Sequence, residues 1–320
     1  MCIRDRNLHH GLVEGKDAIP YLKDMIETYI EYKKYSDVNQ VTESTLKTYE
    51  ITKFRIENFE KYKKKNYLIT EISSDFKDEF VKWAKKTEGY APETYKKTLK
   101  QLRTICRYAK NKKMFVIDES LFIRESASTK KEEQIKEPYL NRLELKKIEQ
   151  YKGSDSLENV RDWLLISCWT ACRVGDLLNL SESDLFTSIS GKKMIKYTQE
   201  KTGHKVTVPI HPVVQFILDK NDGFPRKIST QKYNDYLKDL CEELEFNELM
   251  EGEKFMNVEF GTETKKRKVK GIFPKFELIT SHIGRKSFAT NHYGVLPTHK
   301  VMQVTGHQEI DVFLLYVKDS

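Results

Sequence analysis

A set of residues in the second half of the chain has the side-chain types that chemistry on a phosphate ester requires. An arginine fork can neutralise and orient the charged oxygens of a phosphate through paired N–H bonds. A tyrosine hydroxyl, whose pKa is normally about 10, is a weak nucleophile until a neighbouring group helps to remove its proton. The candidate residues are two arginines, a lysine, two histidines and a tyrosine: Arg173, Lys201, His282, Arg285, His307 and Tyr316.

Each of these residues alone has a more ordinary explanation. Arg173 by itself is typical of a surface or salt-bridge arginine, and Lys201 is typical of an exposed lysine that precedes a Thr-Gly turn. His282 and Arg285 are three residues apart, so on a helix they share one face and can reach one phosphate. A His-x-x-Arg pair alone nevertheless occurs often by chance, which makes it a weak signal.

The last two candidates lie near the C-terminal end of the chain. His307 follows Gly306 at a predicted helix start, and by itself such a histidine is more often structural. Tyr316 is one of 17 tyrosines, and nothing in its local sequence sets it apart. The order and spacing of all the candidates together therefore support the hypothesis of an active site.

Three short stretches around these residues resemble the motifs of the tyrosine recombinase (phage integrase) family. Residues 170–180 read Thr-Ala-Cys-Arg-Val-Gly-Asp-Leu-Leu-Asn-Leu and resemble its first arginine box. Residues 281–290, Ser-His-Ile-Gly-Arg-Lys-Ser-Phe-Ala-Thr, resemble its second, and residues 301–307 with Tyr316 resemble its terminal box. The resemblance extends over roughly residues 20–320, and residues 273–282 are most similar to integrases of mobile elements from Bacteroides-like bacteria.

The resemblance implies a site-specific DNA recombinase or integrase that cleaves and rejoins DNA through a 3′-phosphotyrosyl intermediate. Tyr316 would attack the scissile phosphate, while Arg173 and Arg285 would hold its non-bridging oxygens and stabilise the developing charge. Lys201 would protonate the departing 5′ oxygen, and His282 is the expected general base for the tyrosine.

The same resemblance makes His307 a hydrogen-bond donor to the phosphate. Because the bond energy is kept in the protein–DNA ester, rejoining needs no ATP, which agrees with the lack of a Gly-x-x-x-x-Gly-Lys loop. No cofactor or metal is expected, since clustered carboxylates of the kind that hold two Mg²⁺ ions are not apparent. Cys168 and Cys172, four residues apart on an apolar helix, are interpreted as buried core thiols.

The bulk composition is that of a soluble globular protein, long enough at 320 residues for two ordinary domains. Hydrophobic residues make up 38% and charged residues 32%, and the net charge of +8 weakly favours a polyanionic partner. Five cysteines without paired spacing indicate reduced thiols and a cytoplasmic location. No apolar run approaches the roughly 20 residues that a membrane span requires, and no secretory signal is visible.

The periodicity of apolar residues predicts a mainly α-helical chain with a small β-sheet or hairpin. Residues 18–125 predict a helical bundle, which the resemblance identifies as a SAM-like core DNA-binding domain. Residues 126–137 are polar and aperiodic and predict a linker, and residues 138–320 predict a mixed α+β catalytic domain, truncated at its C-terminal end. Residues 1–17 are interpreted as a leader whose first residues resemble translated adapter sequence.

Within these domains the sequence predicts individual elements from periodicity and from start signals. Thr42 is a candidate N-cap, and Pro92 after Ala91 is typical of a first helical turn. Strands are predicted at 194–199 and 205–210, with a hairpin insertion at 254–270. Helices are predicted at about 18–35, from 43, at 73–86, from 92, and at 211–220, 229–244, 280–292, 297–304 and 309–317.

The helix that begins at Pro92 carries a row of cations at spacings of 4, 3, 4 and 3, which places them on one face. A solvated amphipathic helix is the plainer explanation of such a row. A basic face without a compensating acid favours contact with the DNA backbone. The row comprises Lys96, Lys100, Arg103, Arg107 and Lys110, beside an apolar stripe of Leu99, Leu102, Cys106 and Ala109.

Two alternative functions remain open at this point. A type IB topoisomerase uses related chemistry to relax supercoils as a monomer, and a DNA-binding protein that has lost catalysis would keep only the binding surface. The expected partner is double-stranded DNA, on which the family assembles as a homotetramer. The chain ends four residues past Tyr316, too few for a further helix, so a monomer is expected for the chain as given.

Overall fold

The computed structural model describes residues 19–36, 40–112, 114, 137–260 and 263–317. It is mainly helical with small β-sheets, as the sequence predicts. Contacts divide the chain into two units, the first formed by residues 1–131 and 256–267 and the second by residues 132–255 and 268–320. The expected leader and nearly all of the expected linker lie outside the described residues, so the proposed domain boundaries stay predictions.

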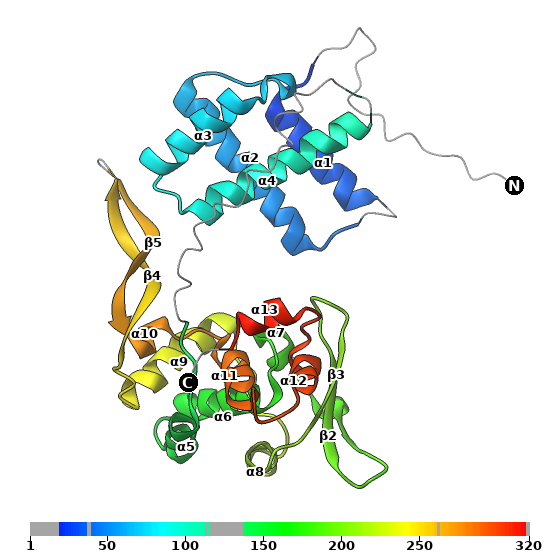
Figure 1. The fold of residues 1–320 in the computed structure, drawn as a ribbon, viewed down its shortest axis with the longest axis vertical. Helices are drawn as coiled ribbons and strands as arrows, with labels where there is room; N and C mark the ends of the chain where they lie inside the picture. Colours follow the sequence, from blue (N-terminus) through cyan, green and yellow to red (C-terminus); the bar gives the residue numbers. More distant parts are fainter. Residues whose placement is uncertain (1–18, 37–39, 113, 115–136, 261–262, 318–320) are drawn as a thin grey trace, which may run out of the picture. The chain divides into compact units, whose positions relative to one another are not determined.

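The first unit is a helical bundle (Figure 1). Its core is rich in aromatic rings. The ring of Phe59 lies 5.5 Å from that of Phe76, 5.4 Å from that of Phe80 and 5.4 Å from that of Trp83. Rings at these separations combine a large buried apolar area with favourable edge contacts. The bundle consists of α1 (Leu22–Tyr35), α2 (Glu43–Lys63), α3 (Ser74–Lys86) and α4 (Pro92–Asn111).

Local sequence signals account for where these helices begin. The side chain of Thr42 accepts a hydrogen bond from the backbone N–H of Thr45 and so caps α2, as predicted. Pro92 occupies the first turn of α4, where its missing N–H leaves no hydrogen bond unmade. α1 begins four residues later than predicted, at Leu22 rather than residue 18.

The predicted hairpin insertion is present as β4 (Leu249–Phe260) and β5 (Glu263–Pro274), which pair with each other in a two-stranded sheet. Residues at its tip belong to the first unit. There the ammonium group of Lys265 lies 3.0 Å from the carboxylate of Glu88. Part of the basic sequence at the tip is therefore paired with an acid.

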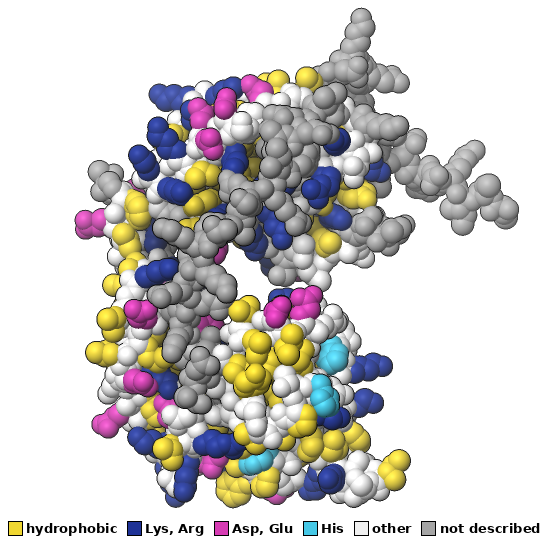
Figure 2. All heavy atoms as spheres, viewed as in Figure 1, with side chains coloured by type: hydrophobic (Ala, Val, Ile, Leu, Met, Phe, Trp, Pro, Cys, Tyr) yellow, Lys and Arg dark blue, Asp and Glu magenta, His cyan; other side chains and the backbone are white. Residues whose placement is uncertain are grey.

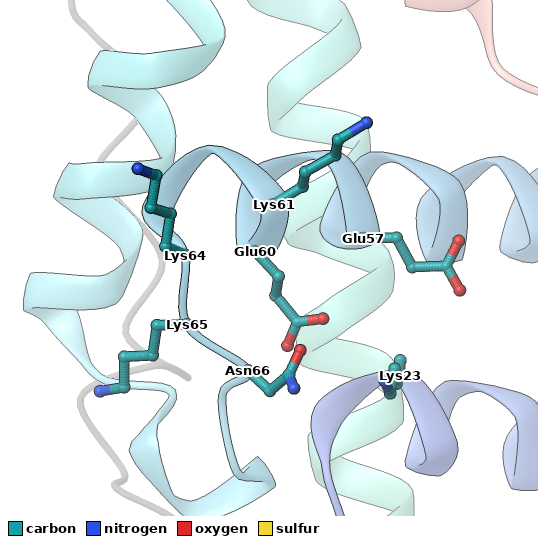
Figure 3. Close-up of a pocket in the computed structure, with 7 residues that line it drawn as sticks. All are labelled: Lys23, Glu57, Glu60, Lys61, Lys64, Lys65 and Asn66. Atoms are coloured by element: carbon teal, nitrogen blue, oxygen red, sulfur yellow. The ribbon is translucent and has the colours of Figure 1, made fainter.

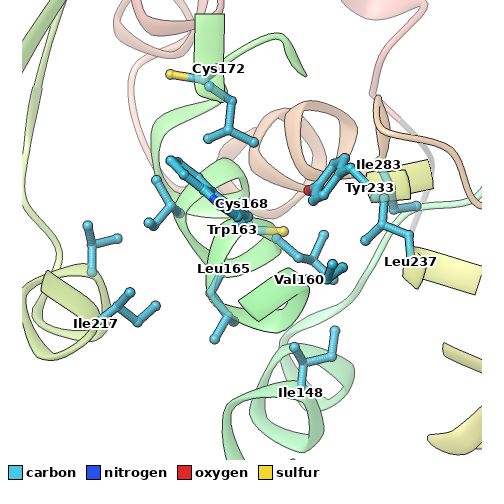
Figure 4. Close-up of a cluster of buried hydrophobic side chains, with 14 of the residues drawn as sticks. Ile148, Val160, Trp163, Leu165, Cys168, Cys172, Ile217, Tyr233, Leu237 and Ile283 are labelled. Carbon is cyan, nitrogen blue, oxygen red and sulfur yellow. The ribbon is translucent and has the colours of Figure 1, made fainter. Parts of the chain in front are cut away.

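The core of the second unit is built around α6 (Asp155–Thr170), whose residues 160–168 are all buried. A helical segment that is buried on every side is typical of the centre of a domain. Figure 4 shows side chains from several helices meeting there, including Trp163 of α6, Tyr233 of α9 (Thr230–Glu243) and Ile283 of α11 (Ile283–His292). The other neighbouring helices are α5 (Arg142–Gln150), α7 (Val174–Leu177) and α8 (Pro212–Asn221).

An antiparallel sheet lies beside this helical core, with the strand order β1-β2-β3. β2 (Lys193–Thr198) and β3 (Lys205–Pro209) agree with the two predicted strands within one residue at either end. Their inward side chains alternate with exposed ones, as a half-buried strand requires. β1 (Leu185–Thr187) was not predicted, because three residues are too few to show a period of two.

The C-terminal part of the second unit consists of short helices, and two local predictions there are wrong. Gly306 adopts φ +68° and ends a helix, so His307 follows a helix end rather than a helix start. The last helix ends at Leu314, so Tyr316 lies beyond it. These helices are α10 (Lys275–Leu278), α11 (Ile283–His292), α12 (Thr298–Thr305) and α13 (Ile310–Leu314).

Among the described residues, no helix is both long enough and apolar enough to span a bilayer.

Candidate active site

Arg285 is the most deeply buried charged residue of the candidate set. It lies in α11, which packs closely on α6 because Gly284 has no side chain there. A Cβ atom on Gly284 would come within 2.2 Å of the hydroxyl oxygen of Ser167. The Arg285 side chain is fully buried, and its Nη1 donates a hydrogen bond to the carbonyl oxygen of Ala171 at 3.0 Å.

The remaining donors of Arg285 are not satisfied. Its Nε and Nη2 atoms are buried and have no hydrogen-bond partner among the described residues. Burial, and then the positive charge of Arg173, lower the pKa of Arg285 to about 10. A buried guanidinium with two unpartnered nitrogen atoms is costly unless an anion completes its hydrogen bonds. This arrangement is therefore suited to holding an oxyanion.

Arg173 is held at the start of α7, directly after α6 ends. Ala171 ends α6 in the left-handed conformation with φ 54°, which turns the chain sharply before Arg173. The half-buried Arg173 donates from Nη1 to Oε1 of Gln199 at 2.5 Å. Because Arg173 is also among the charges that lower the pKa of Arg285, the two guanidinium groups belong to one electrostatic site.

Tyr316 and the two candidate histidines complete this cluster. The ring centroid of Tyr316 lies 4.5 Å from that of His307 and 6.1 Å from that of His282. The backbone of Tyr316 is held by Phe313, whose carbonyl accepts its N–H at 2.8 Å, and by Thr290, which donates to its carbonyl at 3.3 Å. The structure thus brings Arg173, Arg285, His282, His307 and Tyr316 together.

The contacts of His307 favour one tautomer of its neutral ring. Its Nδ1 lies 2.8 Å from the hydroxyl oxygen of Thr305, and that hydroxyl donates its own proton to the carbonyl of Val301 at 3.0 Å. The neutral ring is therefore assigned the Nδ1–H tautomer, which leaves Nε2 as an acceptor. Burial and the charges of Arg285 and Arg173 lower the pKa of His307 to about 4. Donation from Nε2 to a phosphate, the expected role, therefore requires that the phosphate first raise this pKa.

His282 stands immediately before α11, one turn from Arg285 rather than inside the same helix. Part of its side chain is exposed, yet desolvation of the remainder and the charges of Lys286, Arg285 and Arg173 lower its pKa. A neutral imidazole at pH 7 is the form that accepts a proton. This electrostatic environment is compatible with the expected role as a general base.

Lys201 lies on the turn that joins β2 to β3 and is exposed. The turn is attached to α7, because the backbone N–H of Glu200 donates to the carboxylate of Asp176 at 2.9 Å. It is attached a second time through Gln199, which binds Arg173. Gln199 was not predicted to be a site residue, since nothing in its local sequence distinguishes it from any other glutamine at a strand end.

The cations of the predicted basic face all lie on α4 of the first unit. Lys96, Lys100, Arg107 and Lys110 are exposed, and Arg103 is half-buried. The opposite side of α4 is buried in the bundle, including Leu102, Cys106 and Ala109. Lys and Arg side chains cover much of the helical unit on the face that Figure 2 shows.

A polar pocket of about 350 Å³ in the first unit lies between the start of α1 and the end of α2 (Figure 3). The ammonium groups of Lys61, Lys64 and Lys65 point away from one another, so they do not converge on one anion. The carboxylate of Glu60 accepts the backbone N–H of Tyr67 at 2.8 Å and so supports the chain after α2. The pocket is therefore explained as structural.

The two cysteines of the first arginine box region are buried thiols, as predicted. Cys168 and Cys172 lie in the core of the second unit, and burial raises the pKa of Cys172 to about 12. Such thiols stay protonated at neutral pH and do not ligate metals readily. No group of three or more His, Cys, Asp or Glu side chains with metal-binding geometry occurs among the described residues.

Comparison with known proteins identifies the fold. Residues 21–124, which include α1 to α4, match the family model described as the phage integrase SAM-like domain. The integrase of transposon Tn1549, in complex with transposon right-end DNA, superposes with a TM-score of 0.64 at 12% sequence identity, covering 94% of this chain and 96% of that chain. A lambda integrase dimer bound to a COC′ core site gives a TM-score of 0.64 at 16% identity, covering 94% and 96%.

The XerH site-specific recombinase, bound to a palindromic difH substrate after cleavage, gives a TM-score of 0.60 at 16% identity, covering 93% of this chain and 81% of that chain. A search of the curated proteins finds no match. At these identities the likeness shows the fold, which is that of integrases and site-specific recombinases over nearly the whole chain.

Proposed function

We propose that this protein is a tyrosine-type site-specific DNA recombinase that cleaves and rejoins double-stranded DNA through a 3′-phosphotyrosyl intermediate. The observation that carries the proposal is the buried Arg285, whose Nε and Nη2 atoms have no hydrogen-bond partner among the described residues. It lies in the same cluster as Arg173 and Tyr316. An oxyanion would complete the hydrogen bonds of Arg285. Such a site next to a nucleophile fits transfer of a phosphodiester better than DNA binding alone.

The roles follow from the geometry and charge of each group. The hydroxyl of Tyr316 attacks the scissile phosphorus, its proton passes to a neutral imidazole, and the P–O5′ bond breaks. Arg285 and Arg173 hold the non-bridging oxygens and stabilise the negative charge that develops on them. His282 is the proposed proton acceptor. Lys201, on its exposed turn, gives a proton to the departing 5′ oxygen.

His307 takes its proposed role only once the phosphate is bound. A neighbouring anion favours the imidazolium form, which can then donate from Nε2. The reverse reaction uses the same groups, because the phosphotyrosyl ester retains the energy of the broken bond. Rejoining to a different 5′ end therefore exchanges strands without an external energy source.

The helical first unit is proposed to hold the DNA duplex through the cations of α4. All but the half-buried Arg103 are exposed, as neutralisation of backbone phosphates requires. The likeness to a transposon integrase supports a role in a mobile element. Exposed apolar side chains on α13, among them Ile310 and Val312, support assembly of several protomers on DNA.

The test is capture of a covalent protein–DNA adduct. A library of nicked duplexes with a randomised centre serves as substrate, because a nick next to the cleavage point lets the short fragment that carries the free 5′ hydroxyl diffuse away. The wild-type protein is expected to form an adduct that survives denaturing gel electrophoresis. Tyr316→Phe, which removes one oxygen, is expected to form none while it retains DNA binding.

Tyr293→Phe is the matched control, since Tyr293 is an exposed tyrosine of the same unit outside the cluster. It should form the adduct at the wild-type rate. Mass spectrometry of the digested adduct should place the nucleotide on Tyr316. An adduct that persists in Tyr316→Phe would overturn the assignment of the nucleophile. A wild-type protein that binds DNA but never forms an adduct would indicate a binding protein without catalysis.

A further inference from the structure

Gln199 lies where three of the segments that carry the candidate residues meet. It follows the last residue of β2, and its side chain is fully buried. Its Oε1 accepts hydrogen bonds from Nη1 of Arg173 at 2.5 Å and from the hydroxyl of Thr202 at 2.9 Å. Thr202 adjoins Lys201 on the β2–β3 turn, so one amide oxygen joins the first arginine to the lysine-bearing turn.

The third segment is the one that ends at His307. A Cβ atom on Gly306 would come within 2.7 Å of Oε1 and 2.8 Å of Nε2 of Gln199, so the backbone before His307 packs directly on this amide. Gly306 also has φ +68°, a conformation that other residues rarely adopt. The absence of a side chain at Gly306 therefore leaves the space that the buried Gln199 fills.

We propose that Gln199 is a positioning residue for phosphoryl transfer, which acts by fixing the guanidinium of Arg173 and, more weakly, the turn that carries Lys201. This inference rests on the proposed function and adds to it a residue outside the recognised motifs. Arg173 has five N–H donors in a rigid plane. A bond from Nη1 to Gln199 fixes the rotation of that plane and leaves the other donors available for phosphate oxygens.

A neutral amide is better suited to this task than a carboxylate. Glutamate is isosteric with glutamine and would bind Arg173 more strongly, but its negative charge would offset the charge that Arg173 offers to the phosphate. Methionine has a similar length and cannot accept the hydrogen bond well. The two substitutions therefore separate the hydrogen bond from the charge.

The experiment measures single-turnover cleavage of a nicked duplex that the wild-type protein cleaves. Gln199→Met is expected to slow cleavage by about 10-fold to 100-fold, on the scale of misplacing one preorganised donor, with DNA affinity unchanged. Gln199→Glu is expected to be at least as slow as Gln199→Met. Thr202→Val removes only the hydrogen bond from Thr202 to Gln199. It is expected to slow cleavage by less than about threefold.

A double-mutant cycle tests whether Gln199 acts through Arg173. In an Arg173→Ala background, Gln199→Met should cost less than about threefold further, because the group it positions is gone. Gln215→Met is the matched control, since the side chain of Gln215, on α8, donates to the exposed carboxylate of Asp219 on the same helix. It should cleave like the wild type.

Several results would overturn the inference. Wild-type rates for Gln199→Met and Gln199→Glu would show that the bond to Arg173 is unimportant, and equal losses with and without Arg173 would show a general structural role. If Gln199→Met unfolds, as judged by circular dichroism, the isosteric Gln199→Glu decides the question, because near-wild-type cleavage by it excludes the proposal. A wild-type protein that forms no covalent adduct would instead reject the proposed function itself.

Discussion

The cationic face of α4 and the arginine pair of the second unit hold positive charge in opposite ways. On α4 the charges stand in a row at the surface, as Lys100 and Lys110 illustrate. In the second unit Arg285 is fully buried, and its pKa is lowered to about 10 by desolvation and by Arg173. The exposed charges of α4 stay hydrated, whereas folding has already removed water from the guanidinium of Arg285.

This difference predicts two kinds of selectivity. Exposed cations act on any polyanion, at long range, and salt weakens them because released counterions contribute the driving force. A buried guanidinium acts at hydrogen-bond range on one oxyanion in one position, and dissolved salt screens it far less. Binding of the duplex and transfer of its phosphate should therefore respond differently to mutation and to ionic strength.

The largest expected effect comes from the buried charge. Arg285→Ala should slow covalent adduct formation by about 100-fold or more, as expected for loss of a preorganised donor to a developing oxyanion. Arg285→Lys should also lose most activity, because an ammonium group cannot reproduce the planar fork. The measurement is single-turnover cleavage under saturating protein at two salt concentrations.

The loss for Arg285→Ala should be similar at both salt concentrations once all DNA is bound. Arg173→Ala, whose side chain is half-buried, should show a loss of the same order. If the loss of rate in Arg285→Ala or Arg173→Ala depended on salt, the arginine pair would act like an ordinary surface charge. The proposed difference between the pair and the cations of α4 would then be wrong.

A smaller effect, with the opposite salt behaviour, is expected on α4. Joint replacement of Lys100, Arg103 and Arg107 by Gln should weaken DNA binding and lower the slope of log affinity against log salt by up to about 2.7, which is about 0.9 for each lost phosphate contact. Cleavage of DNA that is already bound should change little. Fluorescence anisotropy with a labelled duplex over a series of salt concentrations provides the measurement.

The matched control removes the same charge from α3 of the same unit, by replacing Lys82, Lys85 and Lys86, all exposed, with Gln. This control should leave the slope nearly unchanged. Equal slopes for the two triple variants would indicate a general effect of net charge rather than a binding face on α4.

The smallest effect concerns the protonation of His307. In the free protein its pKa should be near 4, because burial and the two arginines disfavour the imidazolium. Binding of a phosphate analogue such as vanadate should raise the pKa, because the added negative charge stabilises the cation. NMR titration of the His307 ring signals measures both values, and a pKa unchanged by the anion would mean that His307 does not contact it.

The lowered pKa of His307 in the folded protein also makes the stability of the protein depend on pH. Between the unfolded pKa of about 6.5 and the folded pKa of about 4, the unfolded chain binds more protons at His307 than the folded protein does. The contribution of His307 to stability is therefore complete above pH 6.5 and declines as the pH falls through this range. Thr305→Val, which removes the acceptor of Nδ1–H, is a useful comparison in the same titration.

The sequence contained enough information for most of the helices and strands, because those signals are local. Thr42 and Pro92 mark helix starts through bonds to residues only a few positions away. The basic row on α4 is likewise a matter of spacing within one helix. The candidate site residues were selected because their motifs resemble those of a known family, and the structure brings most of them together from distant parts of the sequence.

What could not be predicted depends on contacts between distant segments. The hydrogen bond from Arg285 to Ala171 joins residues 114 positions apart, and the bond from Arg173 to Gln199 joins residues 26 apart. No periodicity or cap signal reports such partners. The positions of His307 and Tyr316 outside the predicted helices have a related cause, since Gly306 ends one helix and α13 is only five residues long.

The two nitrogen atoms of Arg285 that lack a hydrogen-bond partner also affect the stability of this domain. A buried ion whose hydrogen bonds are incomplete lowers the stability of the state that contains it. The domain is therefore less stable than its size and core would allow, and an oxyanion bound at Arg285 would stabilise it, since such a ligand binds the native state and not the unfolded chain. Natural selection for stability alone would replace Arg285 with an apolar side chain of similar volume. Its presence marks a position where chemistry and stability make opposing demands on one residue.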